Sequence, residues 1–173
     1  MNRFTIITLL ALCPLWTSTT TAQDKPKDEW EKHEFKNYFV EFKTPSDWYV
    51  TFNTDSKEEY SYIECVSPDN QMYFFITSTS NELKSSNDII LSYLKVTYST
   101  SQFLLEEQKK INNIDFVFST GITHLENIQT FIKLGVGNHK ERVYLVDSGF
   151  NNVENKEAEK ILQTIIESIR AID

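Results

Sequence analysis

The stretch FVEFKTPSDWYV, residues 39–50, decides how the first part of the chain folds. Within residues 38–43, apolar side chains recur at every second position, which is the period of a strand buried on one face. The polar run 44–47 contains Pro45 and ends this strand in a turn. Trp48 then begins a second strand, at a corner where a large aromatic side chain can close one end of the core. We predict two short strands joined by a turn, with Trp48 buried.

Similar short runs rich in aromatic and β-branched residues follow along the rest of the chain. Strands are predicted at residues 60–66, 72–79, 103–110, 114–123, 129–136 and 141–148, with hairpin-type turns at Asn112-Asn113, Glu126-Asn127 and Asn138-His139. In the run 72–79 both faces are apolar, so this strand is expected to be covered on both faces. Helices are predicted near residues 87–99 and over the C-terminal stripe Ala158, Ile161, Leu162, Ile165, Ile166 and Ile169.

The order of these elements indicates the fold class. Four strands, a helix, four strands and a final helix give the pattern ββββαββββα, and the short connections within each half favour antiparallel pairing. The predicted fold is therefore α+β: a largely antiparallel sheet of about eight strands in a layered α/β/α sandwich with two main helices.

The first corner and the end of the chain resemble a known family. The segment 39–50, in which Trp48 follows Pro45 by three residues, looks like the opening of PsbP-like domains, and the helix that closes on residues 165–169 is similar to their ending. The resemblance in element order covers roughly residues 35 to 172. It implies the α/β/α sandwich that PsbP-like domains share with a Ran-binding nuclear import factor and with exported bacterial proteins of unknown role. It also implies a non-enzymatic binding or assembly protein, and it carries over no functional residue.

The N-terminus is typical of a secretory signal peptide. Arg3 supplies positive charge, the run 4–12 is mostly apolar, and small residues at 20–22 suit a peptidase site. Leu12 stands where lipidation of Cys13 would require a small residue. The apolar run is shorter than the about 20 residues of a spanning helix, so no stable membrane insertion is expected after cleavage. We predict a periplasmic or secreted protein with a signal peptide at 1–22, cleaved after Ala22, a charged leader or tether at 23–34, and one α+β domain at 35–173.

Composition excludes several classes of partner and site. A chain of 173 residues suits one domain, and its formal net charge of -8 argues against nucleic acid as a partner. Only four glycines argue against a phosphate-binding loop, so no cofactor is expected. After cleavage Cys65 would be the single cysteine, which excludes an internal disulfide.

No catalytic, cofactor-binding or metal-binding residue can be assigned from the sequence. Cys65 lies in a predicted strand on the same face as Ile63, where a buried and unreactive thiol is expected. The three histidines, His33, His124 and His139, are too few and too scattered for the three or four convergent ligands that zinc needs.

The helix predicted near residues 87–99 has an unusually wide apolar arc. The arc spans roughly 220°, more than one sheet can cover. Its surplus edge contains Leu91, Leu94 and Tyr98. This edge packs either on another part of the chain, such as the segment around Trp30, or on a partner protein, and the three residues are therefore possible partner contacts.

Three functions remain open at this stage. The first is an exported, non-enzymatic binding or accessory domain of PsbP-like architecture, whose partner is an unidentified protein or small ligand. The second is a small periplasmic or secreted hydrolase whose acidic site is assembled only in the folded chain. The third is an envelope interaction protein that acts through the helix near residues 87–99.

Overall fold

The computed structural model describes residues 29–53, 62–80, 91–92, 94–96, 98, 101–125 and 128–172. Its elements in chain order are β1 (Trp30–Phe35), the 3-10 helix η1 (Lys36–Tyr38), β2 (Val40–Pro45), β3 (Tyr49–Asn53), β4 (Tyr62–Val66), β5 (Met72–Ser80), β6 (Gln102–Ile111), β7 (Ile114–Leu125), β8 (Ile128–His139), β9 (Arg142–Asn151), α2 (Lys156–Ser168) and β10 (Arg170–Ala171). Residues 91–92 and 94–96, between β5 and β6, are also helical.

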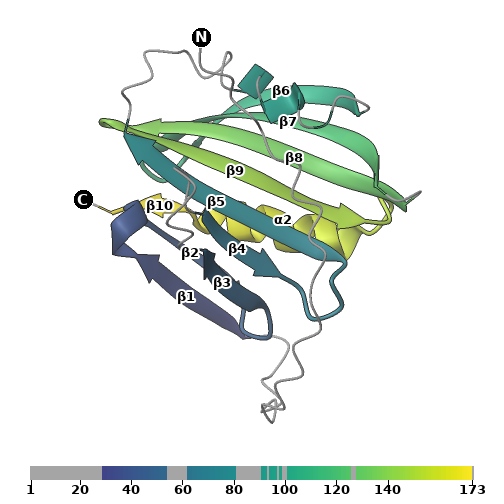
Figure 1. Ribbon diagram of the computed structural model, residues 1–173, viewed down its shortest axis with the longest axis horizontal. Coiled ribbons are helices and arrows are strands. Elements are labelled where there is room, and N and C mark those ends of the chain that lie inside the picture. The colour runs from purple at the N-terminus through teal and green to yellow at the C-terminus, as the bar shows by residue number, and fades with distance from the viewer. Residues whose placement is uncertain are drawn as a thin grey trace.

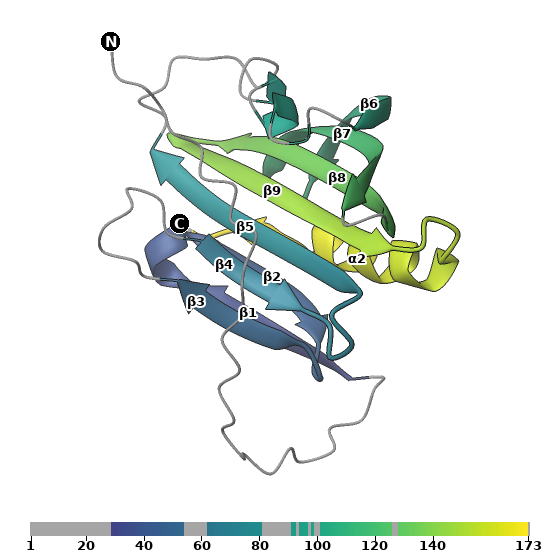
Figure 2. The ribbon, with the colours of Figure 1, turned by 45° about the vertical axis from the view of Figure 1, so that its right-hand side comes forward.

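The strands form two sheets (Figures 1 and 2). Among the described residues, the large sheet has seven strands in the order β3-β4-β5-β9-β8-β7-β6, and the small sheet has three strands in the order β1-β2-β10. Every pair of neighbouring strands is antiparallel. The large sheet therefore consists of two meanders, β3 to β5 and β6 to β9, which are joined where β5 pairs with β9.

Each face of the large sheet packs against a different layer. The inner face, which carries Phe74 and Tyr144, shares the main core with the small sheet and α2, and α2 lies behind the large sheet in Figure 1. The outer face, which carries Leu134 and Val143, forms a second core with Leu91 of the helical segment. The central strands carry apolar residues on both faces, so both faces must be covered. A strand with one face in solvent would instead alternate apolar and polar side chains.

The predicted α+β class is confirmed: the described residues form mostly antiparallel sheet, with α-helix at residues 91–92 and 94–96 and in α2. The division of the strands differs from the prediction, because the described residues form a large and a small sheet rather than one sheet of about eight strands. The two additional strands, β1 and β10, both pair with β2, and the small sheet that results covers the main core beside α2.

The folded part begins earlier than predicted. The tether was expected to extend to residue 34, but residues 30–35 form β1 and pair with β2 along their whole length. The strand was missed because it is an edge strand with mostly exposed side chains, so its sequence is charged rather than alternating. Its charges still take part in the sheet, since Lys32 forms an ion pair with Glu41 of β2 at 2.7 Å.

One predicted hairpin turn also lies elsewhere. Asn138 and His139 were expected to form the turn before the last strand, but both belong to β8, and His139 pairs with Arg142 of β9. The turn consists of Lys140 and Glu141, with Lys140 in the left-handed region at φ 53°. The turn at Asn112-Asn113 is confirmed, whereas Glu126-Asn127 and the predicted signal peptide lie outside the described residues.

The core predictions hold at the corner and in the fourth predicted strand. Trp48 is 7% exposed and belongs to the main core. Phe74 and Ile76 of β5 face the main core, while Tyr73 and Phe75 lie partly buried on the outer face. The sequence pattern of residues 72–79 therefore correctly predicted a strand covered on both faces.

Candidate functional site

An aromatic pocket opens at the edge where the two sheets meet. It is lined by Glu34, Phe35, Lys36, Asn37, Tyr38 and Phe52, and has a volume of about 490 Å³. The first five residues come from the end of β1 and from η1, and Phe52 comes from β3 of the large sheet. We refer to it as the corner pocket.

The chain forms this corner by a tight reversal between β1 and β2. Three residues of 3-10 helix follow Phe35, and Phe39 ends them in the left-handed region with φ 53°. The backbone N–H of Phe39 donates to the carbonyl oxygen of Lys36 at 3.2 Å. This reversal places Phe35 and Tyr38 on the same side of the chain, facing β3.

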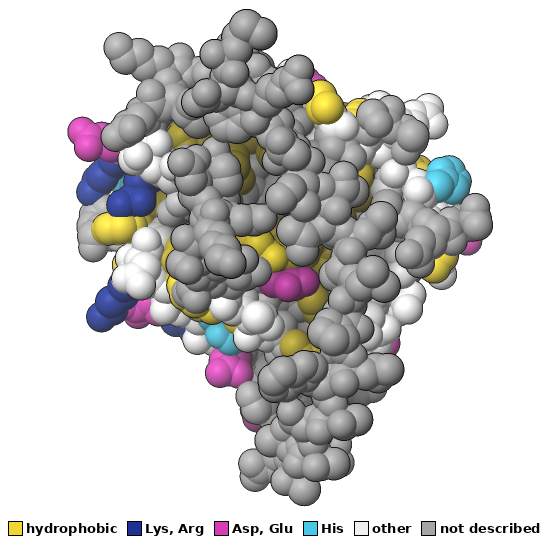
Figure 3. Space-filling model, viewed as in Figure 1, with side chains coloured by type: hydrophobic (Ala, Val, Ile, Leu, Met, Phe, Trp, Pro, Cys, Tyr) yellow, Lys and Arg dark blue, Asp and Glu magenta, His cyan; other side chains and the backbone are white. Residues whose placement is uncertain are grey.

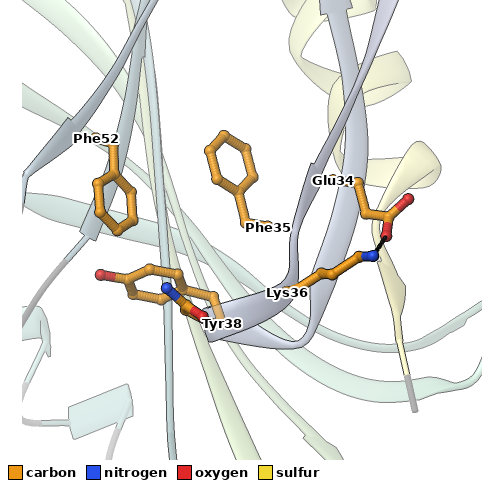
Figure 4. A pocket seen from close by; sticks show the side chains of 6 residues that line it. Glu34, Phe35, Lys36, Tyr38 and Phe52 are labelled. Carbon is orange, nitrogen blue, oxygen red and sulfur yellow. Dashed lines mark ion pairs between the residues drawn. The ribbon is translucent and has the colours of Figure 1, made fainter.

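Three aromatic rings make up the apolar wall of the pocket (Figure 4). The Phe35 and Phe52 rings are stacked with centroids 6.2 Å apart, and Tyr38 meets the edge of Phe52 with centroids 5.2 Å apart. Tyr38 is buried, but Phe52 is 40% exposed. An aromatic ring that remains this exposed inside a hollow provides a surface for a flat apolar group.

Charged groups stand at one side of the pocket. Lys36 and Glu34 form an ion pair at 3.8 Å, and both side chains extend into solvent (Figure 4). A solvated pair of this kind contributes little stability, roughly 0 to 1 kcal/mol, and can therefore rearrange at little cost. The corner pocket can thus combine apolar contact with one charge of either sign.

A second site of unusual chemistry lies on the outer face of the large sheet. The Asp147 carboxylate of β9 accepts a hydrogen bond from the Tyr98 hydroxyl at 2.7 Å and one from the Tyr73 hydroxyl at 3.3 Å. The two hydroxyl oxygens are 3.2 Å apart. Because Tyr98 follows the helical segment and Tyr73 belongs to β5, this acid links the helical layer to the sheet.

Burial raises the pKa of Asp147 to about 6, although the hydrogen bonds from Tyr98 and Tyr73 act in the opposite direction. Burial likewise raises the pKa of both tyrosines, and the negative charge of Asp147 adds to this effect. Figure 3, viewed from this side, shows apolar side chains in the middle of the face. Perturbed carboxyl groups of this kind are common at functional sites, and they also occur as structural links.

A third hollow is polar. It lies between β2 and the end of α2, has a volume of about 530 Å³, and includes Lys32, Lys43, Arg170, Glu41 and Glu167 among its lining residues. Glu41 forms ion pairs with Lys32 at 2.7 Å and with Arg170 at 3.9 Å. Glu167 forms an ion pair with Lys109 at 2.7 Å. Since its acidic groups are already paired with cations, this hollow offers less to a ligand than the corner pocket does.

No protein-family model matches the chain, and no curated protein matches it. Solved structures do. Cyanobacterial PsbP (CyanoP) from Synechocystis matches with a TM-score of 0.65 at 7% identity, over 88% of this chain and 97% of that one. LpqN, involved in cell envelope biogenesis of Mycobacterium tuberculosis, matches with a TM-score of 0.54 at 9% identity, over 84% of this chain and 91% of that one. PA94 of Pseudomonas aeruginosa, a protein of unknown function, matches with a TM-score of 0.50 at 9% identity, over 80% of this chain and 94% of that one.

The chain has a PsbP-like fold. The resemblance predicted from the corner at residues 39–50 and from the order of elements is thereby confirmed at the level of the fold. At these identities the likeness extends to the architecture alone. In the described part of this PsbP-like domain, no helix is long and apolar enough to cross a membrane.

The residues predicted as partner contacts all pack against the PsbP-like domain itself. Leu91 is 2% exposed in the second core, and Leu94 and Tyr98 lie partly buried against the same cluster. These contacts are with strands of the large sheet, whereas Trp30 lies in β1 of the small sheet. Val96 of the same segment is 63% exposed. Capture of a partner by this helix remains a prediction.

The other residues considered from the sequence are dispersed over the PsbP-like domain. Cys65 is buried, as predicted, and burial raises its pKa to about 12, so its thiol stays protonated. His33 bonds to Thr44, His124 is exposed at the end of β7, and His139 bonds to the carbonyl oxygen of Asn113 at 2.6 Å. Among the described residues, no three His, Cys, Asp or Glu side chains are grouped closely enough to hold a metal ion.

Sequence reasoning missed both the corner pocket and the Asp147 site. The run FKNYF at 35–39 is rich in aromatic residues and could have suggested a local cluster. The spacing of residues along the sequence does not indicate that Phe52 completes the aromatic cluster, because Phe52 belongs to the large sheet and Phe35 to the small sheet. Asp147 interrupts an apolar alternation in β9, which was a usable signal of a partly buried acid.

Proposed function

We propose that this PsbP-like protein is an exported binding or accessory domain without catalytic activity, and that the corner pocket is its binding site. The observation that carries the proposal is the 40% exposed ring of Phe52 inside a pocket walled by Phe35 and Tyr38. The pocket takes an apolar or aromatic group, from a small ligand or from a side chain of a partner protein. Support for export comes from the signal-like N-terminus and from the similar fold of LpqN, a protein of cell envelope biogenesis.

A matched pair of variants on one strand tests the pocket. Phe52→Asp places a charge inside the corner pocket, while Tyr49→Asp alters another exposed aromatic of β3, 62% exposed, that does not line the pocket. The probe is anilinonaphthalene sulfonate, an aromatic anion whose fluorescence rises in apolar sites. We expect Phe52→Asp to weaken probe binding at least about tenfold, a change of about 1.4 kcal/mol, and Tyr49→Asp to leave it unchanged.

Equal binding by wild type and Phe52→Asp, with both variants folded by circular dichroism, contradicts the pocket assignment. A second experiment addresses the natural partner: crosslinking in the native envelope followed by mass spectrometry, with the same two variants. A partner that is lost with Phe52→Asp and retained with Tyr49→Asp supports the proposal. Loss with both variants contradicts it.

A small hydrolase is the second candidate, and one observation favours it. Glu64 of β4, Phe75 of β5 and Asp147 of β9 lie in one cross-strand row on the outer face. Burial raises the pKa of both carboxyl groups, as general acids require. Two strand spacings separate their backbones by about 10 Å, with Phe75 between them. Turnover of ester or glycoside substrates that disappears with both Glu64→Gln and Asp147→Asn would establish this function instead.

A further inference from the structure

Strand β6 forms one end of the large sheet and leaves an open edge. It is hydrogen bonded to β7 alone among the described residues, and it runs for 10 residues from Gln102 to Ile111. Leu104 and Leu105 near its start are 58% and 56% exposed. A long edge strand with exposed apolar side chains is a template for another strand.

The hairpin to β7 determines which backbone groups of β6 are open. Ile111 and Ile114 flank a two-residue turn, so they form the hydrogen-bonded pair that closes it. Counting back by twos, residues 109 and 107 also bond to β7. The N–H and C=O groups of Glu106, Gln108 and Lys110 therefore point away from β7 and toward solvent.

The charges along this open edge change sign about its centre. The sequence from residue 106 to 110 is Glu-Glu-Gln-Lys-Lys. An antiparallel neighbour runs in the opposite direction, so the acidic half of one such strand faces the basic half of a second. We propose that two copies of this protein associate through antiparallel pairing of their β6 strands, with Gln108 on the two-fold axis.

In this register every pairing is favourable. The outward-pointing Gln108 meets Gln108 of the second copy, and Glu106 meets Lys110, so open donors face open acceptors. On the opposite face of the sheet, Glu107 meets Lys109 of the second copy. By symmetry each contact between opposite charges occurs twice.

Intramolecular contacts already hold these side chains on the required faces. Glu107 pairs with Lys133 at 2.7 Å and Lys109 with Glu167 of α2 at 2.7 Å, which places both on the inner face. Glu106 pairs with Lys95 of the helical segment, on the outer face. A two-fold axis perpendicular to the sheet preserves these faces, so the acid and base that meet always lie on the same side.

Other registers are disfavoured by charge or by hydrogen bonding. A shift that places Glu107 on the axis pairs this acid with its own copy, and a shift that places Lys109 there pairs two lysines. Like charges directly opposite destabilise a sheet. In the registers between these, a residue whose N–H and C=O groups are open lies opposite a residue whose N–H and C=O groups are already bonded to β7. Among the registers of two β6 strands, the edge thus favours the one with Gln108 on the axis.

The same register covers exposed apolar surface. Leu105, on the inner face, lies opposite Ile111 of the second copy, next to the charged pairs. The irregularity in the ladder between Phe103 and Leu105 bends the strand there and ends the region suitable for pairing. An interface of about seven residues a strand is small, so a dissociation constant on the order of micromolar is expected.

The test is the mass of the purified protein in solution, measured by sedimentation velocity at increasing concentration. We expect wild type to approach twice the monomer mass by about 100 µM. Gln108→Pro removes the open N–H at the axis without touching a bond to β7, and proline is tolerated at such an edge position. We expect it to weaken association at least about tenfold. Gln108→Thr keeps the N–H and should associate as wild type does.

A charge exchange gives a second and independent readout. One variant carries Lys109→Glu and Lys110→Glu, and the other carries Glu106→Lys and Glu107→Lys. Each alone should remain monomeric, and an equimolar mixture should form a heterodimer. A wild type that is monomeric at about 100 µM, a Gln108→Pro variant that associates normally, or a mixture that stays monomeric while both variants melt as folded proteins, would overturn the proposal.

Discussion

The ionised side chain of Asp147 destabilises the folded protein. Its carboxylate is largely removed from water and, among the described residues, accepts hydrogen bonds from the hydroxyls of Tyr73 and Tyr98. Burial outweighs those hydrogen bonds, so the pKa rises from 3.8 to about 6. When the pKa of a carboxyl group is higher in the folded state than in the unfolded state, the fold is less stable with the group ionised than with it protonated. At neutral pH, Asp147 therefore lowers the free energy of unfolding.

Replacement of Asp147 by asparagine should stabilise the protein at high pH alone. Above about pH 7 the ionised carboxylate costs about 3 kcal/mol, from about two pKa units, and Asp147→Asn should recover much of that. As the pH falls from about 6 to about 4 the wild-type group becomes protonated, and the gain should disappear. Urea unfolding at about pH 8 and about pH 4 measures both values. Asp115→Asn, at an exposed acid, is the control. An equal effect of Asp147→Asn at both pH values would contradict the assignment.

Single residues were predictable from sequence where their role depends on the local pattern. Trp48 and Cys65 are buried as predicted: Cys65 lies on the core face of β4, and Trp48 lies in the turn just before β3, where its backbone N–H donates to the carbonyl oxygen of Pro45. The role of Asp147 was not predictable. Its partners Tyr73 and Tyr98 lie 74 and 49 positions away in the sequence, and only the pairing of β5 with β9 and the packing of the helical segment bring them together.

Among the elements, β8 depends on its glycines. A Cβ added to Gly137 would lie 2.5 Å from the Phe116 ring and 2.6 Å from Ile114 Cγ2 on neighbouring β7. Glycine is thus required because the neighbouring side chains fill the space above the strand. We expect Gly137→Ala to lower the free energy of unfolding by about 1 to 3 kcal/mol, the usual cost of overpacking.

A second variant distinguishes overpacking from loss of backbone freedom. Phe116→Leu removes part of the ring that the new methyl group would strike, so the double variant should be less destabilised than the sum of the single ones. Chemical denaturation of the four proteins gives the coupling energy. A coupling energy near zero would show that the ring is not the obstacle.

The existence and type of the longer elements followed from sequence, and their edges did not. In β7, β8 and the final helix apolar side chains recur at the interval of a strand or of a helix, so the predicted and observed ranges of these elements agree closely. β1 was missed since an edge strand buries little and shows no such interval. The small sheet depends on three segments, β1, β2 and β10, from both ends of the chain, and no local pattern predicts that association.

At the scale of the whole molecule, export is the most direct prediction. The mature N-terminus should be Gln23, because the small residues Thr20 and Ala22 form the site that signal peptidase requires. Intact-mass measurement of protein from the native cell envelope checks this. Replacement of Ala22 by a bulky residue should block processing, whereas the same change at Thr21 should have less effect. A retained Met1, or a lipid on Cys13, would contradict the prediction.

The overall architecture was within reach of the sequence, and the candidate site was not. The order of strands and helices, with the corner at residues 39–50, led to a PsbP-like sandwich. The corner pocket needs Phe35 from the small sheet and Phe52 from the large one. Its geometry depends on how the two sheets stack, and residue spacing along one strand contains no information on that.

The strand order of the large sheet also predicts the order in which its strand pairs form during folding. Every pairing between its described strands joins strands that are consecutive in the chain, except that of β5 with β9. Local hairpins close in microseconds, whereas the distant pairing must first overcome the entropy of a long loop. We expect the two meanders to form early and to join last. In pulsed hydrogen exchange, amides that bond β7 to β8 should gain protection before those that bond β5 to β9, and simultaneous protection would contradict this order.

Until that last step the two halves are separate sheets with open edges, so the period before β5 meets β9 is when a newly made chain is most exposed to proteases and to aggregation.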